Sequence, residues 1–429
     1  MNKRLFSLFL FALLFAVSGT AKTQKNIRVT SLKIEGMSTG YNQPVSSADR
    51  LLGLDTPSPR FSWQTESSLR NVVQTGYHIL VASSPERLAA NEGDLWDTGM
   101  VLSRAQLWIP YQGKSLHSNQ RCWWKVMVTT NQGDTSWSEP QLFGVGLLNE
   151  SRWSGRWIGL ESLQPGESRG LHTRMAARYL RKVFKLKGQV KCATAYVAGL
   201  GLHQLYVNGQ QIGSQVLSPI PSDYRKTIYY NTYDVTHQFT DSSVAVGVIL
   251  GNGRYFPMRQ NKPYKIPVFG LPKCRVDIIV EYTNGKTDHL SSDESWKITT
   301  DGPIRANNEY DGEEYDARRE MPGWATVYFN DANWKKAERT DIPTGTLHGL
   351  VTPGMTVVKQ LKPVKITNHI IDFGQNTAGW VRMKVSGQAG DTIRLRYAER
   401  LVDGKLYTDN LRDALSEDIY VCNGTEKGS

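Results

Sequence analysis

The chain has 429 residues and a formal net charge of +11 at pH 7, with 39% hydrophobic and 21% charged residues. This length suits two to four domains of ordinary size. The basic residues are scattered singly among acids, whereas nucleic-acid binders usually gather them into a patch or an arm. The composition therefore indicates a solvated surface with some attraction to acidic glycans, and it speaks against a nucleic-acid partner.

The first 21 residues have the pattern of a secretory signal. Lys3 and Arg4 precede an apolar run from Leu5 to Val17, and Gly19 and Ala21 suit a cleavage site. The run is shorter than the roughly 20 apolar residues of a membrane span, so an uncleaved anchor is the weaker alternative. No later segment of the sequence resembles a membrane helix. We expect an exported protein, located in the periplasm or outside the cell.

Short alternating runs rich in Val, Ile, Tyr and Trp, separated by Gly, Asn, Asp and Pro, recur along the rest of the chain. This pattern predicts an all-β protein built of tandem β-sandwiches. Over residues 27–146, Phe61 and Trp63 share one strand face, and Trp124 alternates with two valines on a later strand. Such spacing is similar to that of a fibronectin type III or immunoglobulin-like domain, with Trp63, Trp96 and Trp124 in its core.

A second domain is predicted over residues 150–345. Asn208-Gly209 has the sequence of a hairpin turn. The arrangement is typical of a jelly roll of the kind that carbohydrate-binding modules use. We assign Trp153, Trp157 and Tyr255 to a core or an interface rather than to a sugar platform. The strand runs of this domain are 179–184, 193–198, 204–209 and 244–250.

A third segment, residues 350–429, has too few strand runs for a complete sandwich. We expect an incomplete β-sandwich with an unpaired strand edge. Unpaired edges are templates for association, so this segment should be the least stable part of the chain. The runs are 370–376, 379–385, 393–399 and 418–422.

The four cysteines are Cys122, Cys192, Cys274 and Cys422. They form no CxxC pair, and no nearby His supplies the spacing of a zinc site. Cys192 and Cys274 could pair in an oxidising compartment. The alternative, which we favour, is four buried thiols on strands.

Three groups of residues, in this order, resemble the bacterial α-L-rhamnosidases of glycoside hydrolase family 78. Each group is weak alone, and their order and separation carry the resemblance over residues from about 27 to the carboxy terminus. The groups are 206–209 with 222–226 and 233–236, then Asp311-Gly312-Glu313-Glu314-Tyr315-Asp316-Ala317-Arg318, then Asp372-Phe373-Gly374-Gln375-Asn376 with Gly379-Trp380 and Tyr397-Ala398-Glu399.

The resemblance implies small β-domains, then an (α/α)6 barrel that carries the general acid and base, then a small carboxy-terminal β-domain. Only the front of this architecture is matched, so we expect a truncated, non-catalytic portion. The complete protein would remove terminal α-L-rhamnose from glycosides or pectic polysaccharides, with a rhamnose-containing glycan as partner and no redox cofactor. One departure is Arg254, which follows Gly-Asn-Gly where the family usually has Trp.

The densest acidic cluster comprises Asp311, Glu313, Glu314 and Asp316. Inverting glycoside hydrolysis needs two carboxyl groups roughly 6.5–9.5 Å apart, one of them held protonated. We assign no catalytic residue, because nothing in the chain resembles the acid-rich stretch of the barrel. In the functional interpretation, Asp311, Glu313 and Asp316 bind the sugar. Calcium is the one possible cofactor, because hard cations take several carboxylate oxygens.

The structural alternative, which we favour, is an acidic loop that braces the contact between domains, with Asp316 paired to Arg318 or Arg319. Asp372 is interpreted as a turn residue and Glu399 as an outward-facing one. For the chain as a whole, two further functions stay open. One is a free-standing carbohydrate-binding protein, and the other is a spacer that positions a catalytic domain.

Overall fold

The structure is a computed structural model that describes residues 27–38, 47–257, 267–350 and 352–425. The predicted signal at residues 1–21 lies outside the described residues. The described part is almost entirely β, with one short α-helix, α1 (Pro85–Ala89). None of the helices in these ranges has the length and apolar character that crossing a membrane requires.

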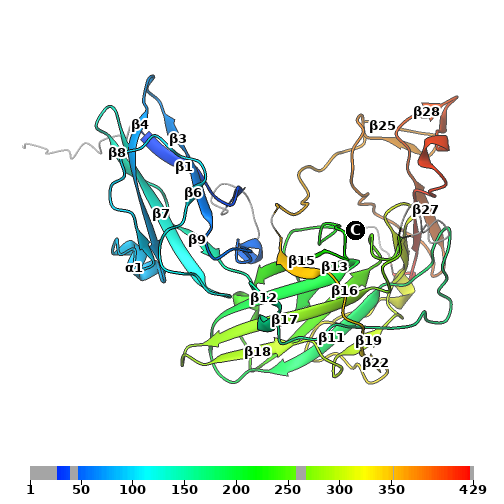
Figure 1. Cartoon of the computed structure of the whole chain (residues 1–429). Coiled ribbons are helices and arrows are strands. Elements are labelled where there is room, and N and C mark those ends of the chain that lie inside the picture. The colour runs from blue at the N-terminus through cyan, green and yellow to red at the C-terminus, as the bar shows by residue number, and fades with distance from the viewer. Residues whose placement is uncertain (1–26, 39–46, 258–266, 351, 426–429) are drawn as a thin grey trace, which may run out of the picture.

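The first domain is a sandwich of two sheets (Figure 1), as the alternating pattern predicts. Phe61, Trp63 and Trp124 are buried between the sheets, and Trp96 lies beside them. One sheet has the order β2 (Met37–Ser38), β1 (Ile27–Ile34), β3 (Arg60–Ser67) and β6 (Ile109–Pro110). The other has β5 (Trp96–Asp97), β4 (Gln74–Ala82), β7 (Arg121–Thr130) and β8 (Thr135–Trp137), with β9 (Gln141–Gly144) also on β7.

The second domain packs two larger sheets face to face around an aliphatic core. Trp153, Trp157 and Tyr255 are buried, in line with their assignment to a core. One sheet has the order β23 (Glu338–Arg339), β10 (Ile158–Gly159), β17 (Lys273–Tyr282), β12 (Val190–Leu200), β15 (Thr227–Asp234) and β24 (Thr346–Gly349), with β18 (Thr287–Ser291) on β17. The other has β14 (Gln210–Ile212), β13 (Leu202–Val207), β16 (Ser243–Gly251), β11 (Arg178–Lys185), β19 (Lys297–Thr299) and β22 (Lys335–Lys336).

A further sheet joins strands from the second and third predicted domains. Its β21 and β30 run parallel, with Glu314 opposite Ile419. The hairpin β20–β21, which falls in the second predicted domain, therefore pairs with a strand of the third segment. The order of the sheet is β20 (Ile304–Asn308), β21 (Gly312–Asp316), β30 (Glu417–Val421) and β27 (Thr392–Arg396).

The third segment contributes little core of its own. Among the described residues after 350, Cys422 is the one buried hydrophobic side chain. No strand forms over residues 379–385, which the alternation predicts as a strand. β27 ends its sheet, and within the described ranges no strand pairs with its outer edge. Two separate hairpins complete the segment: β25 (Lys365–Thr367) with β26 (Ile370–Asp372), and β28 (Leu401–Val402) with β29 (Lys405–Leu406).

Polar contacts also fix the first domain against the second. The His348 Nδ1 atom of β24 lies 2.6 Å from Asp55 Oδ2, and the Gly349 amide donates to the same carboxylate over 3.2 Å. The Tyr230 hydroxyl accepts a hydrogen bond of 2.9 Å from the Leu147 amide. The two sandwiches therefore meet through specific contacts between side chains and backbone rather than through a linker alone.

The pairing of Cys192 with Cys274 does not occur. Both residues lie on neighbouring strands, β12 and β17, but the register sets Cys192 opposite Glu281 and Cys274 opposite Gly199. The thiols are therefore several strand positions apart, beyond the reach of a disulfide. Burial raises the pKa of the Cys274 thiol to about 12, which makes it a poor nucleophile.

Candidate functional site

The acidic cluster lies on the hairpin β20–β21 and its turn. The Asn308 side chain shapes the turn, because its Oδ1 accepts hydrogen bonds from the amides of Tyr310 (3.0 Å) and Asp311 (2.7 Å). Gly312 follows with φ 104°, a conformation that suits glycine. The local sequence thus presents a carboxylate on each side of a tight turn.

Asp311 is buried, and both of its carboxylate oxygens have protein partners. Oδ1 lies 3.0 Å from His172 Nδ1 and accepts a hydrogen bond of 3.0 Å from the Leu415 amide. Oδ2 accepts from Asn308 Nδ2 over 3.0 Å. Asp311 therefore connects a loop of the second domain, its own turn and the third segment.

Asp316 and Glu314 are also paired with cations. Asp316 accepts two hydrogen bonds of 2.9 Å from Arg318 and lies 3.8 Å from Arg319 Nε. The hydrogen bond with Arg318 holds the pKa of Asp316 below its usual value. Arg174 contacts the Glu314 carboxylate at 2.5 and 3.0 Å. The pairing of Asp316 with Arg318 is the contact that the structural alternative names, whereas the pair of Glu314 with Arg174 was not anticipated.

Glu313 differs from the other acids. Among the described residues, no donor is hydrogen-bonded to its carboxylate, and the side chain reaches solvent. Partial desolvation by the surrounding protein, with repulsion from Asp418, raises its pKa to about 7. Asp418 is held in place because it accepts hydrogen bonds from the Glu313 amide (2.8 Å) and the Tyr397 hydroxyl (2.6 Å). Glu313 is thus the carboxyl of the cluster that is open to a ligand.

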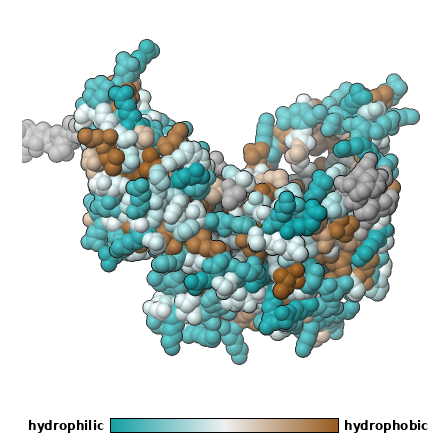
Figure 2. All heavy atoms as spheres, in the orientation of Figure 1, coloured by the Kyte–Doolittle hydropathy of each residue, from teal (hydrophilic) through white to brown (hydrophobic). Residues whose placement is uncertain are grey.

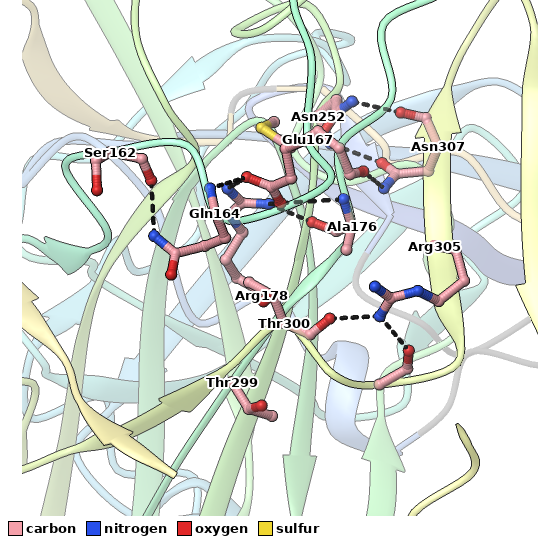
Figure 3. A network of polar contacts seen from close by, with 12 residues as sticks. Ser162, Gln164, Glu167, Ala176, Arg178, Asn252, Thr299, Thr300, Arg305 and Asn307 are labelled. Carbon is pink, nitrogen blue, oxygen red and sulfur yellow. Dashed lines mark hydrogen bonds and ion pairs between the residues drawn. The ribbon is translucent and has the colours of Figure 1, made fainter.

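A network of polar contacts lies next to β20 (Figure 3). Arg178 is fully buried and contacts the Glu167 carboxylate at 2.5 and 2.8 Å. On β20, the Asn307 Oδ1 atom accepts a hydrogen bond of 2.8 Å from the Asn252 amide, and Arg305 donates to the Thr300 carbonyl over 2.5 Å. Since buried polar groups are expensive to leave unpaired, these bonds fix the base of the hairpin.

Arg254 has an aromatic contact of its own. Its Nε lies 2.5 Å from Glu309 Oε1, and its guanidinium lies 5.1 Å from the centroid of the Tyr310 ring. Arginine stacks on aromatic rings in this way. The residue that departs from the family pattern therefore contacts the same turn that carries Asp311.

A calcium site is not supported by this geometry. Within the described ranges, no group of three or more His, Cys, Asp or Glu side chains is arranged to hold a metal ion. The carboxylates of Asp311 and Asp316 are occupied by the partners given above. A Ca²⁺ ion needs six to eight oxygen ligands, which these residues do not offer.

Three family models match the chain in sequence order. The Rha78A-like N-terminal immunoglobulin domain matches residues 41–149, and the alpha-L-rhamnosidase N-terminal domain matches residues 188–359. The bacterial alpha-L-rhamnosidase concanavalin-like domain matches residues 362–429. The chain belongs to the bacterial α-L-rhamnosidase family. The family resemblance read from the motifs is thereby confirmed.

Relatives and solved structures agree with this membership. An α-L-rhamnosidase of Formosa agariphila is 34% identical over 94% of this chain and 44% of its own length. The structure of the α-L-rhamnosidase from Dictyoglumus thermophilum is 37% identical, with a TM-score of 0.79 over 93% of this chain and 44% of that one. The Streptomyces avermitilis α-L-rhamnosidase complexed with L-rhamnose is 24% identical and shares the fold, with a TM-score of 0.79. The present chain spans about half the length of the curated relatives that it matches.

Several site residues of this rhamnosidase family member were not singled out in the sequence. His172, Asp418 and the pair Glu167–Arg178 lie far from the hairpin along the chain and carry no motif of their own. Asp372 is the last residue of β26, and its side chain accepts a hydrogen bond of 2.7 Å from the Gly374 amide. Glu399 is exposed.

Proposed function

We propose that this chain is the non-catalytic β-portion of an exported α-L-rhamnosidase. The whole protein would hydrolyse terminal α-L-rhamnose from glycosides or pectic polysaccharides, with a rhamnose-containing glycan as its substrate. The three β-domains would position the catalytic part. What supports this proposal is the acidic hairpin, because Asp311 contacts Leu415 of the third segment and Glu314 pairs with the distant Arg174, while Asp316 pairs with its neighbour Arg318.

An activity assay tests the non-catalytic assignment. The purified chain should release no p-nitrophenol from p-nitrophenyl α-L-rhamnoside above the level of a buffer control. The Glu313→Gln variant, prepared in parallel, should behave in the same way. Turnover by the parent chain that disappears in Glu313→Gln would overturn the assignment and make Glu313 a catalytic acid.

Carbohydrate binding at the hairpin is a second candidate function, and Glu313 is the observation that favours it. Its carboxyl reaches solvent, and a pKa of about 7 leaves it partly protonated near neutral pH. The protonated form can donate a hydrogen bond to a sugar hydroxyl, and the ionised form can accept one from it. In this proposal Asp311 and Asp316 hold the hairpin in shape. Calorimetry with L-rhamnose, with and without calcium, tests this candidate function. If no heat of binding is measured at millimolar sugar, the function as a spacer is the one that is supported.

Export of the protein is also a proposal, supported by the pattern of residues 1–21. Expression of the full chain in a bacterium with separate cytoplasmic and periplasmic extracts tests it. We expect periplasmic or secreted protein whose first residue follows Ala21. Protein that keeps Met1 and stays in the cytoplasmic extract would refute export.

A further inference from the structure

The tryptophans of this chain divide sharply by exposure. Of the twelve, Trp108 and Trp380 are the two with exposed side chains, at 47% and 62%. Trp380 lies in the third segment, where exposed apolar side chains are common. Trp108 is the residue directly before β6 in the first domain. The sandwich of this domain is packed around its own core. An exposed Trp on a complete domain calls for a physical reason.

The Trp108 ring is held by a preorganised charged pair. The Arg60 guanidinium lies 4.4 Å from the ring centroid. Arg60 is itself fixed by Glu35, with Nη2 to Oε2 at 2.6 Å and Nε to Oε1 at 3.1 Å. The Trp108 amide donates to Ser62 Oγ over 3.0 Å. The guanidinium thus lies over the Trp108 ring while 47% of the residue's surface stays exposed.

The backbone at this site adopts conformations that are unfavourable for ordinary residues. Glu35 and Trp108 have φ of 51° and 57°, in the left-handed region. Gly36 has φ 76°, and a Cβ there would lie 3.2 Å from Trp108 Cη2. Glu35 and Gly36 are the two residues of the turn between β1 and β2, where Ile34 pairs with Met37, and positive φ at both positions is the usual geometry of such a hairpin turn. Here they bring the carboxylate, the guanidinium and the ring together.

This set of groups matches the chemistry of a pyranose. The flat ring offers an apolar surface for the C–H groups of a sugar. Arg60 and Glu35 remain partly exposed, with side-chain exposures of 50% and 21%, so they can donate to and accept from hydroxyl groups at the edge of the ring. Figure 2 shows hydrophobic residues reaching the surface of the first domain, where β1 and β3 lie in Figure 1.

We propose that Trp108, Arg60 and Glu35 form a sugar-binding site on the first domain, separate from the acidic hairpin. The ligand is a neutral pyranose such as a rhamnosyl residue, stacked on the free face of Trp108 and hydrogen-bonded to the charged pair. The small size of the platform and the charges at its rim favour a sugar over a protein partner, which would need a larger patch. The site would hold a glycan on the protein without acting in hydrolysis.

The test uses the full chain and methyl α-L-rhamnoside as the probe, with binding followed by calorimetry and by saturation-transfer NMR. The parent chain should bind the probe with a dissociation constant in the millimolar range. Trp108→Ala should weaken binding roughly tenfold, as expected for the loss of a stacked ring. Trp380→Ala is the matched control and should leave binding unchanged, and Arg60→Gln should weaken it by a smaller factor.

Further variants keep the result decisive. Trp108→Phe retains a smaller ring and should bind with intermediate affinity, and thermal unfolding of each variant shows that it is folded. The proposal is overturned if the parent chain shows no saturable binding, or if Trp108→Ala and Trp380→Ala bind equally well. It is also overturned if the chain self-associates through this surface and Trp108→Ala abolishes the association while sugar binding is absent.

Discussion

The Arg121 guanidinium forms a buried ion pair with Asp234, with both Nη1–Oδ2 and Nη2–Oδ1 at 3.2 Å, and it joins the first domain to the second. Arg50 adds a contact of 3.0 Å to the same carboxylate, which is 3% exposed. Burial alone would raise the pKa of Asp234, but Arg121 and the hydrogen bond from Thr236 lower it below its ordinary value. The Asp234 charge is therefore retained at neutral pH.

Asp234→Asn should destabilise the chain strongly, because it leaves the Arg121 charge buried without its partner. Breaking a buried pair in this way costs about 3–5 kcal/mol. Urea denaturation at pH 7, followed by fluorescence, measures the change in the free energy of unfolding. Arg28→Met, which removes the exposed pair with Glu66, is the control and should leave stability nearly unchanged. Equal stability of the two variants would show that the interface does not depend on this pair.

Asp311→Ala should loosen the attachment of the third segment to the hairpin. The substitution leaves the Leu415 amide and the Asn308 side chain without their acceptor, at a cost of about 1–3 kcal/mol. Amide hydrogen exchange should show faster exchange at Leu415 than in the parent chain. Asp301→Ala removes an exposed acid nearby and should leave this exchange rate as it is. Unchanged exchange at Leu415 in Asp311→Ala would contradict the bracing role.

Stability should fall in mild acid because of His203. This side chain is buried, its Nδ1 has no hydrogen-bond partner among the described residues, and burial lowers its pKa to about 4. The unfolded chain binds the proton near pH 6.5, so the stabilising contribution is complete above that pH and is lost as the pH falls towards 4. The difference is about 3 kcal/mol.

Denaturation midpoints measured between pH 7 and pH 4 test this prediction about His203. His203→Gln removes the titrating group and should flatten the pH dependence over this range, whatever its effect on stability at pH 7. A slope that is the same in the parent and in His203→Gln would assign the acid sensitivity to other groups.

Limited proteolysis should cut the third segment first, and within it residues 352–391. This stretch contains the hairpin β25–β26 and many exposed side chains, including Val358 and Ile366. β27 and β30 should stay attached after the cut, because β30 pairs with β21. Mass spectrometry of the gel-filtration peak should find the fragment that contains β27 and β30 together with the body of the protein. Uniform resistance along the chain, or a peak without that fragment, would refute this order of stability.

The sequence alone determined the strands and their buried faces. Phe61 and Trp63 alternate with polar neighbours, and both are buried as that period requires. Asn208-Gly209 forms the predicted turn between β13 and β14, with φ of 48° and 82°. These features follow from side-chain alternation and local backbone preference, which a few neighbouring residues specify.

The exposure of individual side chains and the register between neighbouring strands were harder to predict from the sequence. Cys192 and Cys274 fall in neighbouring strands, but their offset depends on how β12 is aligned with β17, and a local pattern does not state that offset. Trp108 is of a residue type that usually lies in a core, and the structure shows it exposed beside Arg60 and Glu35.

The tertiary structure alone decided what the acidic cluster does. Its four carboxylates are close in sequence, so their proximity was evident, but their partners were not. Asp311 meets His172 and Leu415, which are 139 and 104 residues away, while Glu313 is left open to solvent. Leu415 comes close to Asp311 because β21 and β30 pair in parallel, while His172 reaches it from the loop that precedes β11. Which strand edges meet depends on the packing of whole sheets, and the residues around Asp311 contain no information about it.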